Sequence, residues 1–600
     1  MIKVIVQLFS LLTVDQRNKF YLLQCLVVCM AIMEMAGIAS IAPFMALVGN
    51  ISLVYEDNFI GYMYTRFGFT DPYEFLFFVG LIVLAALAIS AFVSMITVWK
   101  LAMFAAQIGT EIGDQLYMYY MRQSWLFHSN TSTAELTKNI SSESIRITDQ
   151  IIQPLMQMNS RFVLALFLTI GIVVYKPLVA LVAVSIFLIA YLILFRLVRI
   201  KLAINGQIIS TSLTNRFKLL NEGLGGIKDI LLLNRQKYFV DEFKESGRQF
   251  SRARGRTNAL WQVPRYFMEF LAFGAMISLV LYLISSNNGE LGVILPVLAV
   301  YGFVGFKLLP AFQLIYGSIS QIKGNVAAFE SVSEHLFLSQ REEADEKLES
   351  NESVKPFLEG DVVFKNVSFT YPNKYKPALT EVDLIFPAKK TVGVVGASGS
   401  GKSTLIDILL CLISPAKGSM AVNGIDISSE NKRTWQNSIG FVPQSIFLTD
   451  GTIKQNVAFG VPESDIESDK VKAALKLAQL DDYIETLDLG IDTPVGERGV
   501  QLSGGQRQRI GIARALYDNA SVLVFDEATS ALDGITERMI MESIHSLSGK
   551  KSVVLIAHRL QTVKKCDVIY FIDNGKVVST GTFDELYENS SQFRKMADHS

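Results

Sequence analysis

Residues 391–404 read TVGVVGASGSGKST, and residues 405–412 continue as LIDILLCL. The β-branched run at 391–395 predicts a buried strand, and the apolar residues after 404 predict a helix. Between them, the chain matches the pattern G-x-x-x-x-G-K-[ST], in the strand–loop–helix context that a phosphate-binding loop needs. Its glycines allow backbone N–H groups to approach phosphate oxygens at a helix N-terminus. The sequence therefore predicts an α/β domain built around a phosphate site.

The side chains of this loop have predicted roles. Lys402 reaches the β- and γ-phosphates of a nucleotide, and Ser403 is a ligand of Mg²⁺. A glycine-rich turn without function is the alternative, but it does not explain why motif and context coincide. The other loop residues that we expect at the nucleotide are Gly396, Ser398, Gly399, Ser400, Gly401 and Thr404.

A second apolar strand, SVLVF at 521–525, ends in Asp526 and Glu527. An acid at the carboxyl end of a buried parallel strand points into the ligand crevice. We therefore expect Asp526 to hold Mg²⁺. Glu527 is placed to polarise an attacking water molecule as a general base.

The N-terminal part of the chain has a different composition. The whole chain is 50% hydrophobic and only 18% charged, with a mean hydropathy of +0.34, whereas soluble proteins carry about 25% charged residues. Apolar runs of about 18 or more residues predict membrane-spanning helices. The six predicted spans are residues 20–48, 75–99, 154–175, 178–198, 263–285 and 291–317. The polar segments 100–153 and 199–262 contain few helix breakers, so they predict long helical extensions outside the bilayer.

The distribution of Lys and Arg orients these helices. The segment 199–262 carries about a dozen basic residues, whereas the loop 49–74 carries only Arg66. We therefore expect the long extensions, the N-terminus and the phosphate-loop domain on the cytoplasmic side. Residues 2–18 predict an amphipathic helix on the inner membrane face. They do not predict a cleaved signal peptide, because charged residues and a full span follow the short apolar run.

Three parts are predicted: a transmembrane domain at 1–335, a charged linker at 336–357 and the α/β domain at 358–600. Lys and Arg number 55 and Asp and Glu number 56, so the net charge of −1 argues against binding of nucleic acid by bulk charge. Four cysteines in 600 residues are too few for a disulfide framework.

Residues 502–506 read LSGGQ, which is the signature of ATP-binding-cassette (ABC) proteins. The segment 358–600 resembles that family over its whole length. The resemblance implies that ATP is bound with Mg²⁺ and hydrolysed. It also implies nucleotide contacts for the signature residues Ser503, Gly504, Gly505 and Gln506.

Other motifs of the ABC family occur in the family's order. Tyr371 matches the aromatic residue that stacks on adenine, and Gln444 matches the glutamine that binds Mg²⁺ and senses the γ-phosphate. Residues 530–533 match the D-loop of the family, and the resemblance implies a nucleotide contact for Asp533. His558 follows an apolar strand and matches the switch histidine that contacts the γ-phosphate. The resemblance assigns His558 to the catalytic residues, together with Glu527.

Each chain has one phosphate loop and one signature. In the ABC family the signature of one cassette completes the nucleotide site of another, so the resemblance implies a homodimer, with a heterodimer as the alternative. A head-to-tail pair related by a two-fold axis satisfies this requirement.

Six spans ahead of such a cassette resemble the type IV (ABCB-like) exporter fold. The resemblance implies a half-transporter in the bacterial inner (cytoplasmic) membrane, with its nucleotide-binding domain in the cytoplasm. The fold class is thus a membrane all-α domain of six transmembrane helices fused to an α/β P-loop domain. Short coupling helices are expected near 129–136 and 230–239, at the tips of the long extensions.

Ionisable residues inside membrane spans are costly and often functional. Arg265 and Lys307 lie in the segments VPRYFME (263–269) and KLLP (307–310), which resemble bacterial lipid-linked oligosaccharide flippases of the PglK type. This implies a polyprenyl-diphosphate-linked saccharide as the substrate, with the two cations near its diphosphate. The alternative for Arg265 is an ion pair within its helix, because Glu269 is four residues away.

Other functions stay open at this point. A lipid or multidrug exporter of the same fold is the nearest alternative. A receptor or channel that uses ATP only as a ligand is a different class, and it has no need of a general base such as Glu527.

Overall fold

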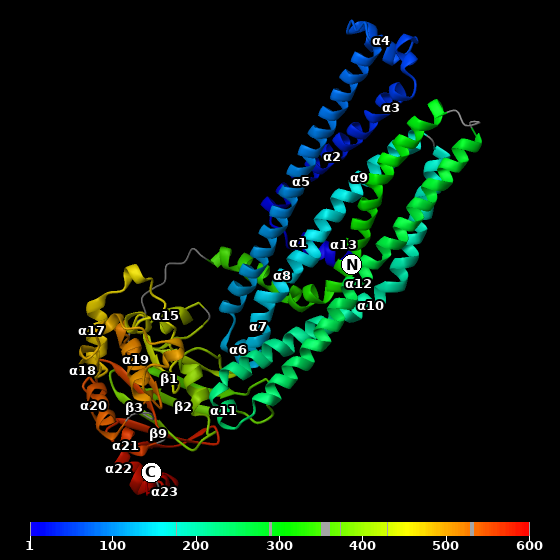
Figure 1. Cartoon of the computed structure of the whole chain (residues 1–600). Helices are drawn as coiled ribbons and strands as arrows, with labels where there is room; N and C mark the ends of the chain where they lie inside the picture. The colour runs from blue at the N-terminus through cyan, green and yellow to red at the C-terminus, as the bar shows by residue number, and fades with distance from the viewer. Residues whose placement is uncertain are drawn as a thin grey trace. The chain divides into compact units, whose positions relative to one another are not determined.

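The structure is a computed structural model that describes residues 2–175, 177–286, 291–349, 360–372, 374–428, 430–528, 533–557 and 559–598. It divides into two compact units. The first comprises residues 1–123 and 127–350, and the second comprises residues 124–126 and 351–600. In Figure 1, long helices coloured blue to green form the first unit, and strands with shorter helices form the second.

Up to residue 349 the described chain is helical. Its elements are α1 (Ile2–Leu11), α2 (Val14–Ala39), α3 (Ile41–Gly49), the 3₁₀ helix η1 (Ile51–Tyr55), α4 (Phe59–Arg66), α5 (Pro72–Arg122), α6 (Trp125–Asn130), α7 (Thr133–Lys138), the π-helix η2 (Asn139–Glu143), α8 (Ser144–Ile147), the π-helix η3 (Thr148–Ile152), α9 (Gln153–Tyr175), α10 (Pro177–Gly225), α11 (Ile227–Leu232), α12 (Gln236–Ser286) and α13 (Leu291–Glu349).

Five of the six predicted spans are confirmed as helices that are long and apolar enough to cross a membrane. Within the part of the chain that the structure describes, they are Val14–Gly49, Pro72–Arg122, Thr133–Val174, Gln236–Tyr282 and Tyr301–Arg341. The predicted fourth span, 178–198, lies in α10, and its first side chains fall outside the described residues. Many apolar side chains of the spans are exposed, among them Phe77 and Phe92 on α5, which suits helices that face lipid.

The N-terminal helix is shorter than predicted. α1 ends at Leu11, and Thr13 begins a new helix, so the expectation of one helix over 2–18 is wrong. The Thr13 hydroxyl accepts a hydrogen bond from the Gln16 N–H, and the Gln16 side chain accepts one from the Thr13 N–H. This capping box satisfies two N–H groups that a helix start leaves open, and it fixes the boundary.

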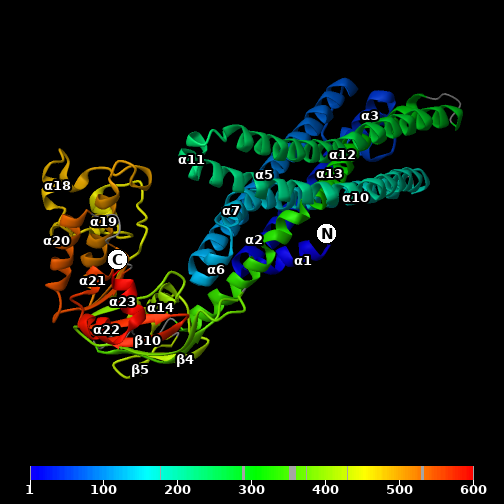
Figure 2. The same cartoon turned by 90° about the horizontal axis from the view of Figure 1, so that it is seen from below.

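The tips of the long extensions carry short helices near the predicted positions. α10 and α12 lie side by side in both views and are joined through α11 (Figures 1 and 2). The range 230–239 crosses the end of α11, the turn at Asn234 with φ of +54° and the start of α12. The range 129–136 likewise crosses from α6 into α7. The predicted ranges therefore overlap the short helices α6, α7 and α11 in part.

α10 and α13 approach each other closely at two glycines. A Cβ atom added to Gly206 would lie 2.2 Å from the carbonyl oxygen of Gly324. Only small residues permit such contact between helix backbones, as is common between membrane helices. Further along, α13 continues to Glu349, so the first part of the predicted linker 336–357 is helical, and 350–357 lies outside the described residues.

The second unit contains two sheets. Its strands are β1 (Val362–Phe369), β2 (Leu379–Phe386), β3 (Thr391–Val395), β4 (Lys417–Val422), β5 (Ile425–Asp426), β6 (Ile439–Val442), β7 (Val522–Asp526), β8 (Ser552–Ile556), β9 (Val568–Asp573) and β10 (Lys576–Gly581). Its helices are α14 (Lys402–Leu409), α15 (Lys432–Gln436), α16 (Ile453–Val457), η4 (Glu463–Asp465), α17 (Ser468–Leu477), α18 (Asp481–Glu485), η5 (Gly490–Asp492), η6 (Glu497–Gly499), α19 (Gly504–Tyr517), α20 (Gly534–His545), α21 (Leu560–Val563), α22 (Phe583–Asn589) and α23 (Ser591–Asp598).

The six-stranded sheet has the order β10-β9-β3-β8-β7-β6, and all its pairs except β10·β9 are parallel. The other sheet, β2-β1-β4-β5, is antiparallel. On β8, Ile556 is opposite Val394 of β3 and also opposite Asp526 of β7. The carboxyl ends of β3 and β7 are therefore level, which brings the phosphate loop and the acidic pair to one edge.

Candidate nucleotide-binding site

The phosphate loop has the backbone that its glycines predict. It leaves β3 and enters α14, whose first residue is Lys402. Gly399 and Gly401 have φ of +76° and +108°, a region that disfavours residues with a Cβ atom. A Cβ on Gly396 would lie 2.1 Å from the Ile572 carbonyl oxygen. The loop thus needs glycine at these positions for its shape, independently of any ligand.

Lys402 folds back over its own loop. Its Nζ donates hydrogen bonds of 2.9 Å to the carbonyl oxygens of Gly396 and Ala397. Burial lowers the pKa of Lys402, and the carboxylates of Glu527 and Asp526 oppose this shift. The ammonium group is therefore held inside the loop, where a phosphate would lie, with two acids nearby.

A cavity of about 290 Å³ opens beside the loop. Its lining brings together six of the predicted residues, which are Tyr371, Gly399, Gly401, Lys402, Ser403 and Thr404. The Tyr371 hydroxyl lies 3.3 Å from the Thr404 hydroxyl, and its ring packs edge-on against Phe369. The predicted adenine-stacking residue thus borders the same cavity as the phosphate loop.

The acidic pair lies next to Gln444. The Gln444 Nε2 donates a hydrogen bond of 2.6 Å to the Glu527 Oε2, which fixes the orientation of this carboxylate. Glu527 has φ of +50°, and its backbone N–H donates to the Ile556 carbonyl oxygen. A left-handed backbone is uncommon for a residue other than glycine. It turns the chain at the end of β7, directly after Asp526.

The donor set fits Mg²⁺. Ser403, Asp526 and Gln444 offer hydroxyl, carboxylate and amide oxygens, the ligands that this hard cation prefers. Because Gln444 uses its amide nitrogen to bind Glu527, its amide oxygen remains on the other side of the group. Asp407, one turn into α14, has a pKa raised to about 6 by burial and by the charge of Asp526.

The signature residues lie at the start of another helix. Ser503 caps α19: its hydroxyl accepts from the Gln506 N–H, and its own N–H donates to the Gln506 Oε1. Ser503 and Gly504 are exposed, and Gly505 and Gln506 are partly exposed. None of the four lines the cavity beside the phosphate loop.

Two remaining predictions concern loops that are described only in part. Asp533 caps α20, because its carboxylate accepts from the N–H groups of Ile535 and Thr536. The bond from Thr536 contributes most to lowering the pKa of Asp533. The preceding residues 530–532 and the predicted catalytic His558 lie outside the described residues.

Sequence reasoning missed the far wall of the cavity. Lys376, Asn574 and Gly575 line it, and the Lys376 Nζ donates to the Asn574 Oδ1 at 3.2 Å. Asn574 and Gly575 form the two-residue turn between β9 and β10, with φ of +47° and +77°. An Asn-Gly pair between two apolar runs predicts such a hairpin, so the turn was detectable, although its place beside the cavity was not.

The two predicted substrate cations in the spans have acidic partners. Arg265 Nε lies 2.6 Å from the Glu269 Oε1 on the same helix, as the alternative interpretation expected. Lys307 Nζ lies 3.2 Å from the Glu34 Oε2 on α2. Glu34 is buried and also accepts a hydrogen bond from the Ser94 hydroxyl. The partner of Lys307 was not identified from the sequence.

Comparisons with known proteins agree with this architecture. Residues 379–530 match the family described as ABC transporter, and residues 40–306 match the family described as ABC transporter transmembrane region. A bacterial Atm1-family ABC exporter with ATP bound superimposes with a TM-score of 0.79 at 21% identity, covering 97% of this chain and 98% of that one. This likeness shows the fold.

Curated relatives match over varying lengths. The ATP-dependent lipid A-core flippase of Thiobacillus denitrificans is 31% identical over 63% of this chain and 64% of that protein. The Escherichia coli K12 flippase of the same name is 39% identical over 40% of each chain. The uncharacterized ABC transporter ATP-binding protein YknU of Bacillus subtilis is 28% identical over 83% of each chain. The chain thus spans less than two thirds of the length of either flippase.

Sequence, strand order and site geometry lead to one conclusion. The chain joins an ABC transporter transmembrane region to an ABC transporter nucleotide-binding domain, in the fold of an ABC exporter.

Proposed function

We propose that the protein hydrolyses ATP to move a lipid across a membrane. The observation that carries this proposal is the assembly at the carboxyl edge of the sheet, where Lys402, Glu527 and Gln444 converge. A protein that only binds ATP needs the lysine and the loop but has no use for an oriented carboxylate. The names of the flippase relatives support lipid as the class of cargo.

The mechanism follows from the residues of the chain. Backbone N–H groups of the loop and the Lys402 ammonium hold the phosphates. When bound, Mg²⁺ would be held by Ser403, Asp526 and Gln444 and would neutralise charge on the β- and γ-phosphates. Glu527, oriented by Gln444, accepts the proton of the attacking water. His558 is proposed to contact the γ-phosphate.

The working unit is proposed to be a homodimer. Ser503 to Gln506 are at least partly exposed and lie away from the cavity that the same chain's phosphate loop forms. A signature at the surface is available to the loop of a second chain, and a two-fold axis makes both sites equivalent. Hydrolysis at such an interface couples opening and closing of the dimer to the spans. We place the protein in the bacterial inner membrane, with this domain in the cytoplasm.

The finer proposal is a polyprenyl-diphosphate-linked saccharide as cargo. Arg265 and Lys307 support it because they place cations in apolar spans. Both are ion-paired, so an incoming diphosphate has to compete with Glu269 and Glu34. The alternative is a lipid or multidrug exporter of the same fold.

The test is ATPase activity of the purified protein in proteoliposomes, with and without a polyprenyl-diphosphate oligosaccharide. We expect turnover to rise with the lipid-linked saccharide. Stimulation only by amphipathic drugs would favour the alternative, and no turnover in any condition would contradict the proposal of an ATPase.

A further inference from the structure

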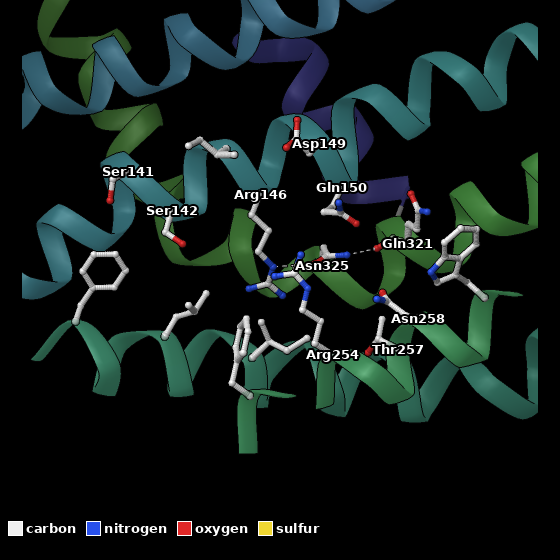
Figure 3. A pocket seen from close by; sticks show the side chains of 16 residues that line it. Ser141, Ser142, Arg146, Asp149, Gln150, Arg254, Thr257, Asn258, Gln321 and Asn325 are labelled. Atoms are coloured by element: carbon white, nitrogen blue, oxygen red, sulfur yellow. Dashed lines mark hydrogen bonds between the residues drawn. The ribbon is translucent and has the colours of Figure 1, made fainter. Parts of the chain in front are cut away.

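A second cavity, of about 570 Å³, lies within the helical unit and far along the chain from the phosphate loop. Figure 3 shows side chains from several helices converging on it. Its lining comes from the η2–η3 segment, α10, α12 and α13. The polar residues among its walls are Ser141, Ser142, Arg146, Asp149, Gln150, Arg254, Thr257, Asn258, Gln321 and Asn325.

Arg146 is the fixed cation of this cavity. Its guanidinium donates to the Asn325 Oδ1 at 2.7 Å, to the Glu143 Oε2 at 3.2 Å and to the Gly206 carbonyl oxygen at 3.2 Å. Glu143 is fully buried and also lies 3.9 Å from the Nζ of Lys138. These contacts come from three helices and hold the guanidinium in one place, and one carboxylate is shared by two cations.

Arg254 is the second cation, and its side chain is exposed at the cavity. Among the described residues it has no ion pair or hydrogen bond, and its guanidinium lies 5.6 Å from the centre of the Phe250 ring. Figure 3 shows the guanidinium groups of Arg146 and Arg254 next to each other. The Asp149 carboxylate belongs to the same lining, but in Figure 3 it points away from both. Two adjacent like charges repel, so an anion between them would relieve the repulsion.

A buried hydroxyl in the wall also lacks a partner. The Thr257 side chain is only 6% exposed, and its Oγ1 makes no hydrogen bond within the described structure. Buried polar groups are almost always hydrogen-bonded, so an orphan at a cavity wall suggests a ligand or a water. Because Thr257 is one turn along α12 from Arg254, both can reach the same bound group.

The remaining walls suit a saccharide. Trp261, Phe217 and Phe250 offer apolar ring faces, and Asn258, Gln150 and Gln321 offer amides. A sugar ring has an apolar C–H face and hydroxyl groups that need hydrogen-bond partners. Specific pockets combine apolar walls with a few placed polar groups in this way. Arginines bind phosphate through two parallel N–H bonds, so the set fits a phosphorylated sugar.

A neighbouring apolar cavity favours a lipid over a soluble phosphate. This apolar cavity, of about 350 Å³, is lined among others by Ala272 and Met276 of α12 and by Phe312 of α13. It continues along the same two helices as the polar one. At 1.5 Å per residue, Phe312 lies about 14 Å from Gln321 and Ala272 about 16 Å from Trp261. An amphipathic molecule long enough to span this distance can therefore reach both cavities.

We propose that the polar cavity binds the phosphate-bearing saccharide headgroup of an amphipathic lipid, with its phosphate on Arg254 and Arg146 and its chains along the apolar cavity. The inference rests on the proposed function and names a headgroup site distinct from Arg265 and Lys307. Arg146 is held in place by its own hydrogen bonds and positions the phosphate. Arg254 and Thr257 have hydrogen-bond donors that are free to bind it.

The binding test uses the full-length protein in detergent and the fluorescence of Trp261, taken as the difference between wild type and Trp261→Phe. The probes are undecaprenyl diphosphate, undecaprenol and inorganic diphosphate. We expect Arg254→Ala to raise the Kd for undecaprenyl diphosphate by about 10–100-fold, since a hydrogen-bonded charge is lost. Thr257→Val should raise it by about fivefold, and Arg254→Lys should lie between wild type and Arg254→Ala.

Arg252→Ala and Arg256→Ala are the matched controls, because both arginines are exposed on the same helix and neither belongs to the cavity lining. Their Kd values should equal the wild-type value. Thermal unfolding checks that each variant is folded. If Arg254→Ala does not fold, the milder variants Thr257→Val and Arg254→Lys still test the inference.

Four results would overturn the inference: no binding of undecaprenyl diphosphate, equal binding of undecaprenol, equal binding of free diphosphate, or an unchanged Kd in the Arg254 variants. ATP-driven flipping of the same lipid in proteoliposomes separates this inference from the proposed function. Wild-type flipping that Arg254→Ala leaves intact overturns only the headgroup site. A confirmed binding series without ATP-driven flipping overturns only the function.

Discussion

The cavity beside the phosphate loop and the polar cavity of the helical unit both present cations, but they are built from different kinds of contact. In the first, the cation is held by its own loop, because the Lys402 side chain bends back onto the carbonyl oxygens of Gly396 and Ala397. The second is made by side chains from four separate parts of the chain, and its Arg146 is hydrogen-bonded to residues of three helices. One depends on local backbone shape, and the other depends on helix packing.

This difference teaches where each cavity is sensitive. In the loop, a substitution acts on the chemistry directly, because the fold around it is fixed by buried strands such as β3. In the spans, a substitution that removes one member of an ion pair leaves the other in an apolar setting. Its first effect is then on folding, and any effect on transport follows from that.

The largest expected effect is on ATP hydrolysis at the site beside the phosphate loop. Glu527→Gln should lower ATP turnover by about 10²–10⁴-fold, because a general base is lost. ATP binding should persist, since the new amide can still accept a hydrogen bond from Gln444. Steady-state ATPase and nucleotide-binding assays check this, with Glu463→Gln on exposed η4 as the control. Unchanged hydrolysis would refute the role of Glu527, and lost affinity would mean that its role is structural.

The helical unit should respond through stability. Lys307→Ala leaves the Glu34 carboxylate, which is only 3% exposed, without its cation inside a span. We expect the free energy of unfolding to fall by about 2.5–3.5 kcal/mol. Arg265→Ala should cost less, because Glu269 is 28% exposed and its carboxylate is therefore less deeply buried than that of Glu34.

Thermal unfolding in detergent measures both variants. Adding Glu34→Gln to Lys307→Ala should restore much of the lost stability, since the stranded charge is removed. Equal shifts for Lys307→Ala and Arg265→Ala would break the distinction between buried and exposed ion pairs in this unit.

A moderate effect tests whether two chains share each nucleotide site. A chain carrying both Lys402→Ala and Ser503→Arg should inactivate both sites of any mixed dimer. If chains pair at random and sites are shared, an equal mixture retains about a quarter of the wild-type turnover. Independent chains would retain about half. Turnover across a series of co-expression ratios distinguishes a quadratic from a linear decline.

The smallest effect concerns Asp407. Its pKa of about 6 lies above the unfolded value of 3.8, so the native state binds the proton more tightly, and the free energy of unfolding falls as the pH rises from about 4 to 6. Asp407→Asn should therefore be more stable than wild type at pH 7, by less than about 1 kcal/mol because the group is partly solvated. The difference should vanish near pH 4, and thermal unfolding at both pH values checks it.

Contiguous motifs explain what could be predicted. The loop from Gly396 to Thr404 and the pair Asp526–Glu527 were identified because strand, turn and helix signals lie next to each other. Their proximity also followed, since parallel strands end at one edge. The position of Asn574 beside the cavity did not follow, because it depends on how β9 pairs with β3.

Contacts between distant helices could not be derived in this way. The pairing of Lys307 with Glu34 and of Arg146 with Asn325 depends on which helix faces meet, and apolar spans have little periodicity to indicate it. The predicted spans were visible in composition alone, and five of the six are confirmed as long apolar helices. The hydrophobic pattern does not mark the end of α1, which depends on the helix cap that Thr13 and Gln16 form.

The glycine contact between α10 and α13 has a mechanical consequence. If the helices rotate about Gly206 and Gly324, the crossing acts as a fulcrum, and the arm of α10 from Gly206 to Gly225 is about 28 Å long. A rotation of about 5° would then move the far end of α10 by about 2.4 Å, but Ile209 by only about 0.4 Å. Ile209 and Asn325 line the polar cavity close to this fulcrum, whereas Phe217, which lines the cavity from the same arm, would move by about 1.4 Å. The rotation would therefore leave one wall of the cavity in place and shift another.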